Sequence, residues 1–135
     1  SLTKPSAENM FVTAITTLWF SAISSAVVDN IPFVASMIPL VVDTAHAVLP
    51  SGTDFKSVVQ HPTLMPVWWS LALGACLGGN GSPVGASANV ITLGLAEKAG
   101  YPISFKKFVL YAIPITIETI IIATIYVWLR YYIIL

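Results

Sequence analysis

The feature that most constrains the fold is a long run of residues without charge. Between Lys56 and Glu97 the chain contains no aspartate, glutamate, lysine or arginine. Soluble domains carry roughly 25% charged residues, whereas 9% of this chain is charged and 56% is hydrophobic. This composition predicts an all-α integral membrane protein rather than a water-soluble enzyme.

A glycine-rich segment divides the uncharged run. Residues 78–85 read GGNGSPVG, and each apolar half beside them is too short to cross about 30 Å of hydrocarbon alone. We therefore predict a broken transmembrane helix over 66–98, unwound at 78–85. Such backbone is tolerated at membrane depth only where protein or water satisfies it, which favours an ion or substrate site over a kink whose glycines merely permit close packing. The candidate ligands here are Gly79, Asn80, Gly81, Ser82, Ser87 and Asn89.

A second candidate site lies near the N-terminal end. Two apolar stretches over 10–49 are joined by a short polar tip near 24–32, which predicts a re-entrant helical hairpin. Its candidate ion ligands are Ser24, Ser25, Asp29 and Asn30. A carboxylate at membrane depth costs at least a few kcal/mol and usually marks a pathway or proton relay, but Asp29 could equally cap the helix that follows it. Both interpretations stay open.

The remaining segments connect and anchor these two features. Residues 1–9 are expected to form a connector or interfacial lead-in, residues 50–65 an exposed connector, and residues 99–104 a cytoplasmic loop, because Lys98, Lys106 and Lys107 flank it. The segment 105–135 predicts a final transmembrane helix. Its lone Glu118 suggests a structural or interface role, with a proton relay as the alternative.

The charge balance and the residue types present also exclude several classes of protein. Six basic and six acidic residues cancel, so no basic face for nucleic acid is expected. No combination of residues for nucleophilic catalysis is apparent, so we do not expect an enzyme. We expect no cofactor beyond a coupling Na⁺ or H⁺. We also expect no metal site beyond Na⁺ at the candidate ion ligands given above. Because the chain starts at Ser1 rather than Met, we expect a longer parent protein. Its N-terminal repeat would complete the site, since many transporters are built from two repeats.

Three stretches carry a resemblance to a known family: Leu73 to Val90, Ala96 to Tyr101, and Ser25 to Pro32. They resemble the C-terminal repeat of the ion transporter superfamily, in the branch of the P protein of melanosomes, the arsenite permease membrane subunit and the NhaD-type sodium/proton antiporters. The resemblance implies one half of an inverted-repeat transporter, in which the hairpin tip and the broken helix meet near the midplane. It also implies ligands at Asn30 and within 80–89, and an association as a homodimer.

Two departures from the family pattern bear on the substrate. Dicarboxylate carriers of the superfamily have Ser-Asn-Thr at the hairpin tip, where this chain has Val28-Asp29-Asn30, and Ser82-Pro83 replaces an expected Thr-Leu. We therefore predict the C-terminal part of a secondary active transporter for a small ion, with Na⁺/H⁺ antiport first and an arsenite or other small-anion permease as the alternative. A membrane packing subunit without transport is the alternative of another class. The expected location is the cell membrane, plasma or inner, or an organellar membrane.

Overall fold

All the regular structure in the described part of the chain is helical. The computed structural model describes residues 7–49 and 52–134, and residues 1–6, 50–51 and 135 of the expected lead-in, connector and final helix lie outside it. This confirms the all-helical prediction. In chain order the elements are α1 (Ala7–Ser25), α2 (Asn30–Val48), α3 (Phe55–Gln60), η1 (Pro62–Leu64), α4 (Met65–Gly78), η2 (Gly79–Gly81), α5 (Ser87–Lys98), α6 (Phe105–Trp128) and η3 (Leu129–Ile133).

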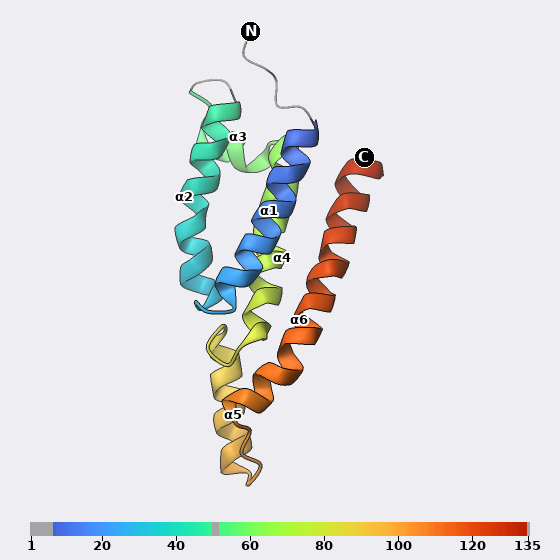
Figure 1. Ribbon diagram of the computed structural model, residues 1–135. Coiled ribbons are helices and arrows are strands. Elements are labelled where there is room, and N and C mark those ends of the chain that lie inside the picture. The colour runs from blue at the N-terminus through green and yellow to red at the C-terminus, as the bar shows by residue number, and fades with distance from the viewer. Residues whose placement is uncertain (1–6, 50–51, 135) are drawn as a thin grey trace.

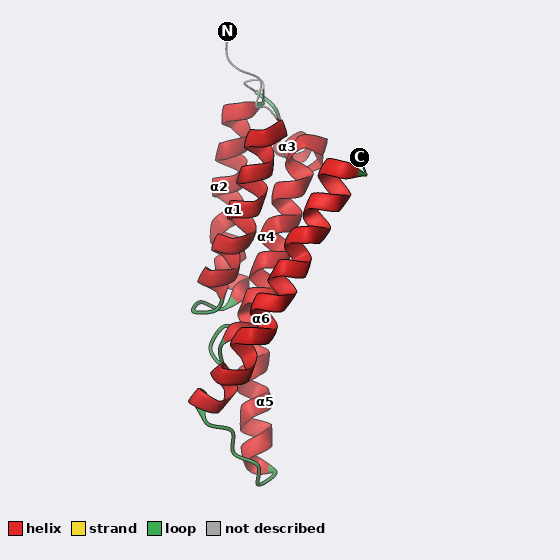
Figure 2. Cartoon of the chain, turned by 45° about the vertical axis from the view of Figure 1, so that its right-hand side comes forward, coloured by secondary structure: helices red, strands yellow, loops and turns green. Residues whose placement is uncertain are grey.

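The helices form an elongated bundle with one projecting arm. In Figures 1 and 2, α1, α2 and α4 run side by side, and α6 packs along α4. Helix α5 continues beyond the end of the hairpin formed by α1 and α2, and none of its residues is buried. The chain therefore has a packed bundle at one end and an interrupted helix, α4–η2–α5, that leaves it.

The core is built by helical spacing. Met10, Ala14, Leu18 and Ala22 recur every four residues along α1, so they form one stripe, and this stripe is buried. Side chains from the other helices complete a single apolar cluster, which includes Val41, Ala45, Val58, Leu64, Val67, Leu71, Ile120, Ala123 and Val127.

Two glycines allow α1 and α4 to approach closely. A Cβ atom at Gly74 would lie 2.3 Å from the carbonyl oxygen of Leu18, and one at Gly78 would lie 2.2 Å from that of Ala22. Glycines four residues apart form such a contact face on membrane helices. Gly78 was predicted to be unwound, but it is the last residue of α4 and a packing glycine. Gly74, which lies before the predicted unwound segment, has the same role.

The segment predicted as an exposed connector is folded in its described part. Asp54 caps α3, because its side chain accepts hydrogen bonds from the Ser57 hydroxyl (2.5 Å) and the Ser57 backbone N–H (3.4 Å). These bonds, the hydroxyl first, hold the pKa of the Asp54 carboxyl below its usual value. Val58 and Leu64 are buried in the core, since a hydrophobic side chain on a short helix gains by closing the end of a bundle.

One helix in the described ranges is long and apolar enough to cross a membrane. It is the continuous segment Phe105–Ile133, with 29 residues and a mean hydropathy of 2.1 over its most apolar part. Several large aliphatic side chains on it are exposed, among them Leu110, Ile115 and Ile122. An exposed apolar face of this kind is typical of contact with lipid or with further protein.

Candidate functional site

The hairpin tip is a short turn stabilised from both sides. Helix α1 ends at Ser25 and α2 begins at Asn30. The backbone N–H groups of Val27 and Val28 donate to the carbonyl of Ser24 at 3.1 and 2.9 Å. On the other side, Asp29 is the N-cap of α2, and its Oδ1 accepts from the N–H of Ile31 at 3.1 Å. The capping interpretation of Asp29 is thus observed.

The interruption between α4 and α5 is organised by a single amide. The Nδ2 atom of Asn89 donates to the carbonyl oxygens of both Gly79 and Ser82, each at 2.9 Å. The N–H of Gly85 donates to the Ser82 hydroxyl at 3.1 Å. These hydrogen bonds give the segment a defined shape, and the carbonyls of Gly79 and Ser82 already accept hydrogen bonds from Asn89.

The tip and the interruption meet in one polar junction. The buried hydroxyl of Ser25 donates to the carbonyl of Ala75 at 2.7 Å, and the Ser82 hydroxyl donates to the carbonyl of Ala26. Both the backbone N–H of Ser87, at 3.0 Å, and its hydroxyl donate to Oδ2 of Asp29. The structure therefore brings Ser25 and Asp29 of the hairpin tip together with Ser82 and Ser87 of the interrupted helix, which lie more than fifty positions away in the sequence.

Asp29 lies at the N-termini of two helices at once. Its Oδ1 accepts from the first turn of α2, and its Oδ2 accepts from Ser87, the first residue of α5. Helix N-termini carry a partial positive charge, and hydrogen bonds donated to a carboxylate favour its charged form. The geometry thus places the Asp29 carboxyl group between α2 and α5, with hydrogen-bond donors from both helices.

Glycine is required where the interruption folds against itself. A Cβ atom at Gly85 would lie 2.6 Å from the carbonyl oxygen of Gly79 and 2.7 Å from that of Ser25. Gly81 is less constrained, because a Cβ there would meet Cβ of Ala26 at 3.3 Å. The backbone approach at Gly85, at the far end of the loop, is therefore the tightest point between the tip and the interruption.

Three predicted site residues lie apart from this junction. Asn80 is exposed and lines a cavity of about 420 Å³ together with Lys107 and Thr116. Thr116 is buried and would touch a Cβ at Gly81, whereas Glu118, two residues and about 200° further round α6, is exposed. Glu118 therefore lies on the opposite face of α6 from Thr116. Asn30 begins α2, and its amide makes no hydrogen bond to the described residues.

Sequence reasoning missed the contribution of α4 and α6 to this region. The pattern Gly74-x-x-x-Gly78 was a usable signal for the close approach of α1. Thr116 gave no signal, because its burial beside Gly81 depends on how α6 folds back along α4. Within residues 7–49 and 52–134 there is no group of three His, Cys, Asp or Glu side chains that could hold a metal ion.

Comparison with known proteins defines the class. The chain is 45% identical over 127 residues to an uncharacterized transporter of Mycobacterium tuberculosis, which covers 94% of the chain and 27% of that protein. It is also 45% identical over 122 residues to the 46 kDa membrane protein of Mycobacterium leprae, covering 89% and 26%. The human P protein is 39% identical over 113 residues, covering 84% and 12%.

The chain is therefore homologous to one part of these proteins, which confirms the resemblance to the P protein branch. It spans about a quarter of the length of the mycobacterial relatives. No protein-family model and no solved structure matches it.

Proposed function

We propose that this chain forms part of a secondary active ion transporter, in which the hairpin and the interrupted helix move as one ion-binding unit. The observation that carries the proposal is the position of Asp29, which is bonded to the hairpin and to α5 at the same time. Discontinuous helices that meet in this way form the ion sites of many transporters. Relatives named as transporters support the same class.

Cation/proton exchange is the first candidate activity. The junction offers one carboxylate, from Asp29, and the hydroxyls of Ser25, Ser82 and Ser87. Oxygen atoms of these kinds are the ligands that hard cations such as Na⁺ prefer. An ion that enters here would compete with Ser87 for the carboxylate, so binding and the bond between α2 and α5 would be coupled.

A small-anion permease is the second candidate, and it rests on a different observation. The N-termini of α2 and α5 converge on the junction, and helix N-termini favour anions. In this alternative an anion would replace the Asp29 carboxylate as the partner of the Ser87 N–H.

Reconstitution of the full-length parent protein into liposomes with a trapped pH dye distinguishes these activities. We expect addition of Na⁺ or Li⁺ to change the internal pH, and the Asp29→Asn variant to abolish that response. Asp43→Asn is the matched control, because Asp43 is exposed on α2 away from the tip. Uptake of a labelled anion such as arsenite, without a cation response, would favour the permease.

A second variant separates ion binding from packing. Ser87→Ala removes the hydroxyl donor but keeps the Asp29 carboxylate, so transport should persist with altered ion affinity if Asp29 binds the ion. Absence of transport of any tested ion by the wild type would leave only the packing-subunit alternative.

A further inference from the structure

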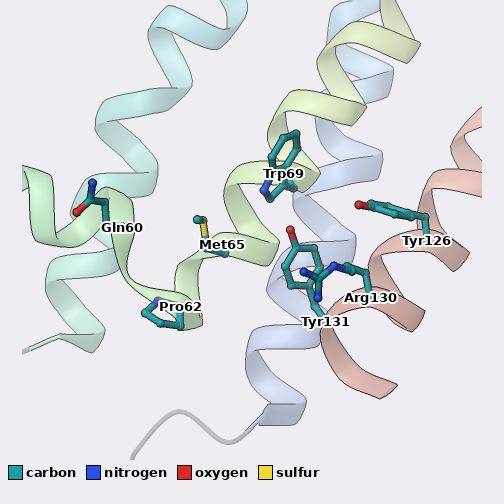
Figure 3. Close-up of a pocket in the computed structure, with 7 residues that line it drawn as sticks. All are labelled: Gln60, Pro62, Met65, Trp69, Tyr126, Arg130 and Tyr131. Carbon is teal, nitrogen blue, oxygen red and sulfur yellow. The ribbon is translucent and has the colours of Figure 1, made fainter. Parts of the chain in front are cut away.

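A groove at the opposite end of the bundle from the hairpin tip has the chemistry of an anion site. It has a volume of about 440 Å³ and lies between the N-terminal end of α4 and the C-terminal end of α6. Figure 3 shows Tyr126, Arg130 and Tyr131 reaching from α6 and η3 toward Trp69 and Met65 of α4. Gln60 and Pro62 complete its lining.

Hydrogen-bond donors dominate this groove. They are the guanidinium of Arg130, the indole N–H of Trp69 and the hydroxyls of Tyr126 and Tyr131, and no carboxylate is present in the lining. None of these groups has a hydrogen-bond or ion-pair partner among the described residues. The guanidinium lies 5.5 Å from the ring centroid of Tyr131, which holds it by a cation–π contact. Free donors around one cation favour an anionic ligand.

The backbone supports a built site rather than a chance arrangement. Arg130 and Tyr131 belong to η3, a π-helical segment in which the N–H of Ile134 donates to the carbonyl of Leu129 at 2.9 Å. Segments of π-helix are rare and occur frequently at functional sites. Here the wider turn changes the direction of Arg130 and Tyr131 relative to a regular α-helix.

The position along α6 selects the source of the anion. Arg130 lies three residues before the C-terminal end of the candidate membrane span Phe105–Ile133, which is long enough to cross the roughly 30 Å of hydrocarbon. A helix of this length therefore places Arg130 at the level of the lipid headgroups. The exposed Ile121, Ile122 and Ile125 lie about one and a half to two and a half turns deeper, where acyl chains would run.

We propose that this groove binds the phosphate headgroup of an anionic membrane lipid, with Arg130 as the charged ligand and Trp69 and Tyr126 as neutral donors. Basic pockets between transmembrane helices on the cytoplasmic side recognise such headgroups, so the proposal requires Arg130, instead of the 99–104 loop, to lie on that side. The acyl chains would lie along the exposed aliphatic face of α6.

Native mass spectrometry of the full-length protein released from detergent micelles tests this site. The probes are phosphatidylglycerol and phosphatidylcholine with identical acyl chains. We expect the wild type to retain more phosphatidylglycerol, and Arg130→Gln to lower that retention about fivefold, as for one basic side chain near an anionic surface. Lys106→Gln is the matched control, because it removes an exposed cation from the other end of α6 and should leave retention unchanged.

Three outcomes would overturn the proposal. Equal retention of the two lipids, or unchanged retention in Arg130→Gln, would show that the groove does not recognise a charged headgroup. Displacement of phosphatidylglycerol by millimolar inorganic phosphate would show a site for the free anion. Because Arg130 is exposed, the variant is expected to fold, and a size-exclusion profile equal to that of the wild type verifies this. None of these three outcomes depends on whether the protein transports an ion.

Discussion

The substitution Gly78→Ala should separate the two helices that position the site. The added Cβ would lie 2.2 Å from the carbonyl oxygen of Ala22 and 2.4 Å from its Cα. Ordinary contact begins near 3.4 Å, so α1 and α4 must separate by about 1 Å, because backbone atoms cannot rotate away. Overpacking of this kind costs about 1–3 kcal/mol, and the better helix propensity of alanine returns at most about 1 kcal/mol.

Because all three clashes are with backbone atoms at 2.2–2.6 Å, the cost should lie in the upper part of that range, about 2–3 kcal/mol. The net loss of unfolding free energy should therefore be about 1–2 kcal/mol. Gly94→Ala is the matched control, since Gly94 is also helical but no atom lies within 4 Å of a Cβ built there. It should raise stability by up to about 1 kcal/mol. Unfolding of the full-length protein by titration with a denaturing detergent, followed by tryptophan fluorescence, measures both variants.

A stability of Gly78→Ala equal to that of the wild type would refute the reasoning. It would show that α1 and α4 do not touch through Gly78 in the whole protein. A loss of the same size in Gly94→Ala would be equally damaging, because it would assign the effect to any alanine placed on the interrupted helix.

Two further predictions concern the junction and the connector. Asn89→Ala should destabilise the interruption by about 1–3 kcal/mol, because the carbonyls of Gly79 and Ser82 lose a common donor. We expect hydrogen exchange across 79–89 to be faster than in the wild type. Unchanged exchange would contradict the prediction. Ser57→Ala should raise the pKa of Asp54 toward its usual value, because the hydroxyl is the main cause of the lowered pKa. The ionised Asp54 cap stabilises α3 above the pKa of Asp54 in the unfolded chain, and this stabilisation is lost as the pH falls through the lower pKa of Asp54 in the folded chain. The variant should therefore lose the cap at a higher pH than the wild type. Carbon-13 NMR titration of the Asp54 carboxyl would detect the difference.

The sequence predicted the helical class and both interruptions because each has a local cause. The polar tip ends at Asp29, a residue type that caps helices, and the glycine-rich run cannot continue a helix cheaply. These signals act within a few residues, so they can be read from one segment at a time. The structure places a turn at 26–29, inside the predicted tip, but residues 78–81 remain helical and the non-helical segment is 82–86 instead of 78–85.

The partners of each polar group could not be predicted. Two arrangements depend on how the helices pack: Asp29 accepts from Ser87, and Asn80 lines a cavity with residues of α6. Contacts of this kind are set by the shapes of whole helices. The groove around Arg130 could not be predicted either, because Trp69 and Arg130 are far apart in the sequence.

The hydrogen bonds between the tip and the interruption also have a mechanical consequence. A single bond would act as a pivot, about which the hairpin could swing freely. The structure has separate attachments at Ser25, Ser82 and Ser87, spread over both sides of the loop. A displacement of the projecting arm formed by α5 would therefore move the hairpin with it, because the three attachments together oppose rotation at the junction.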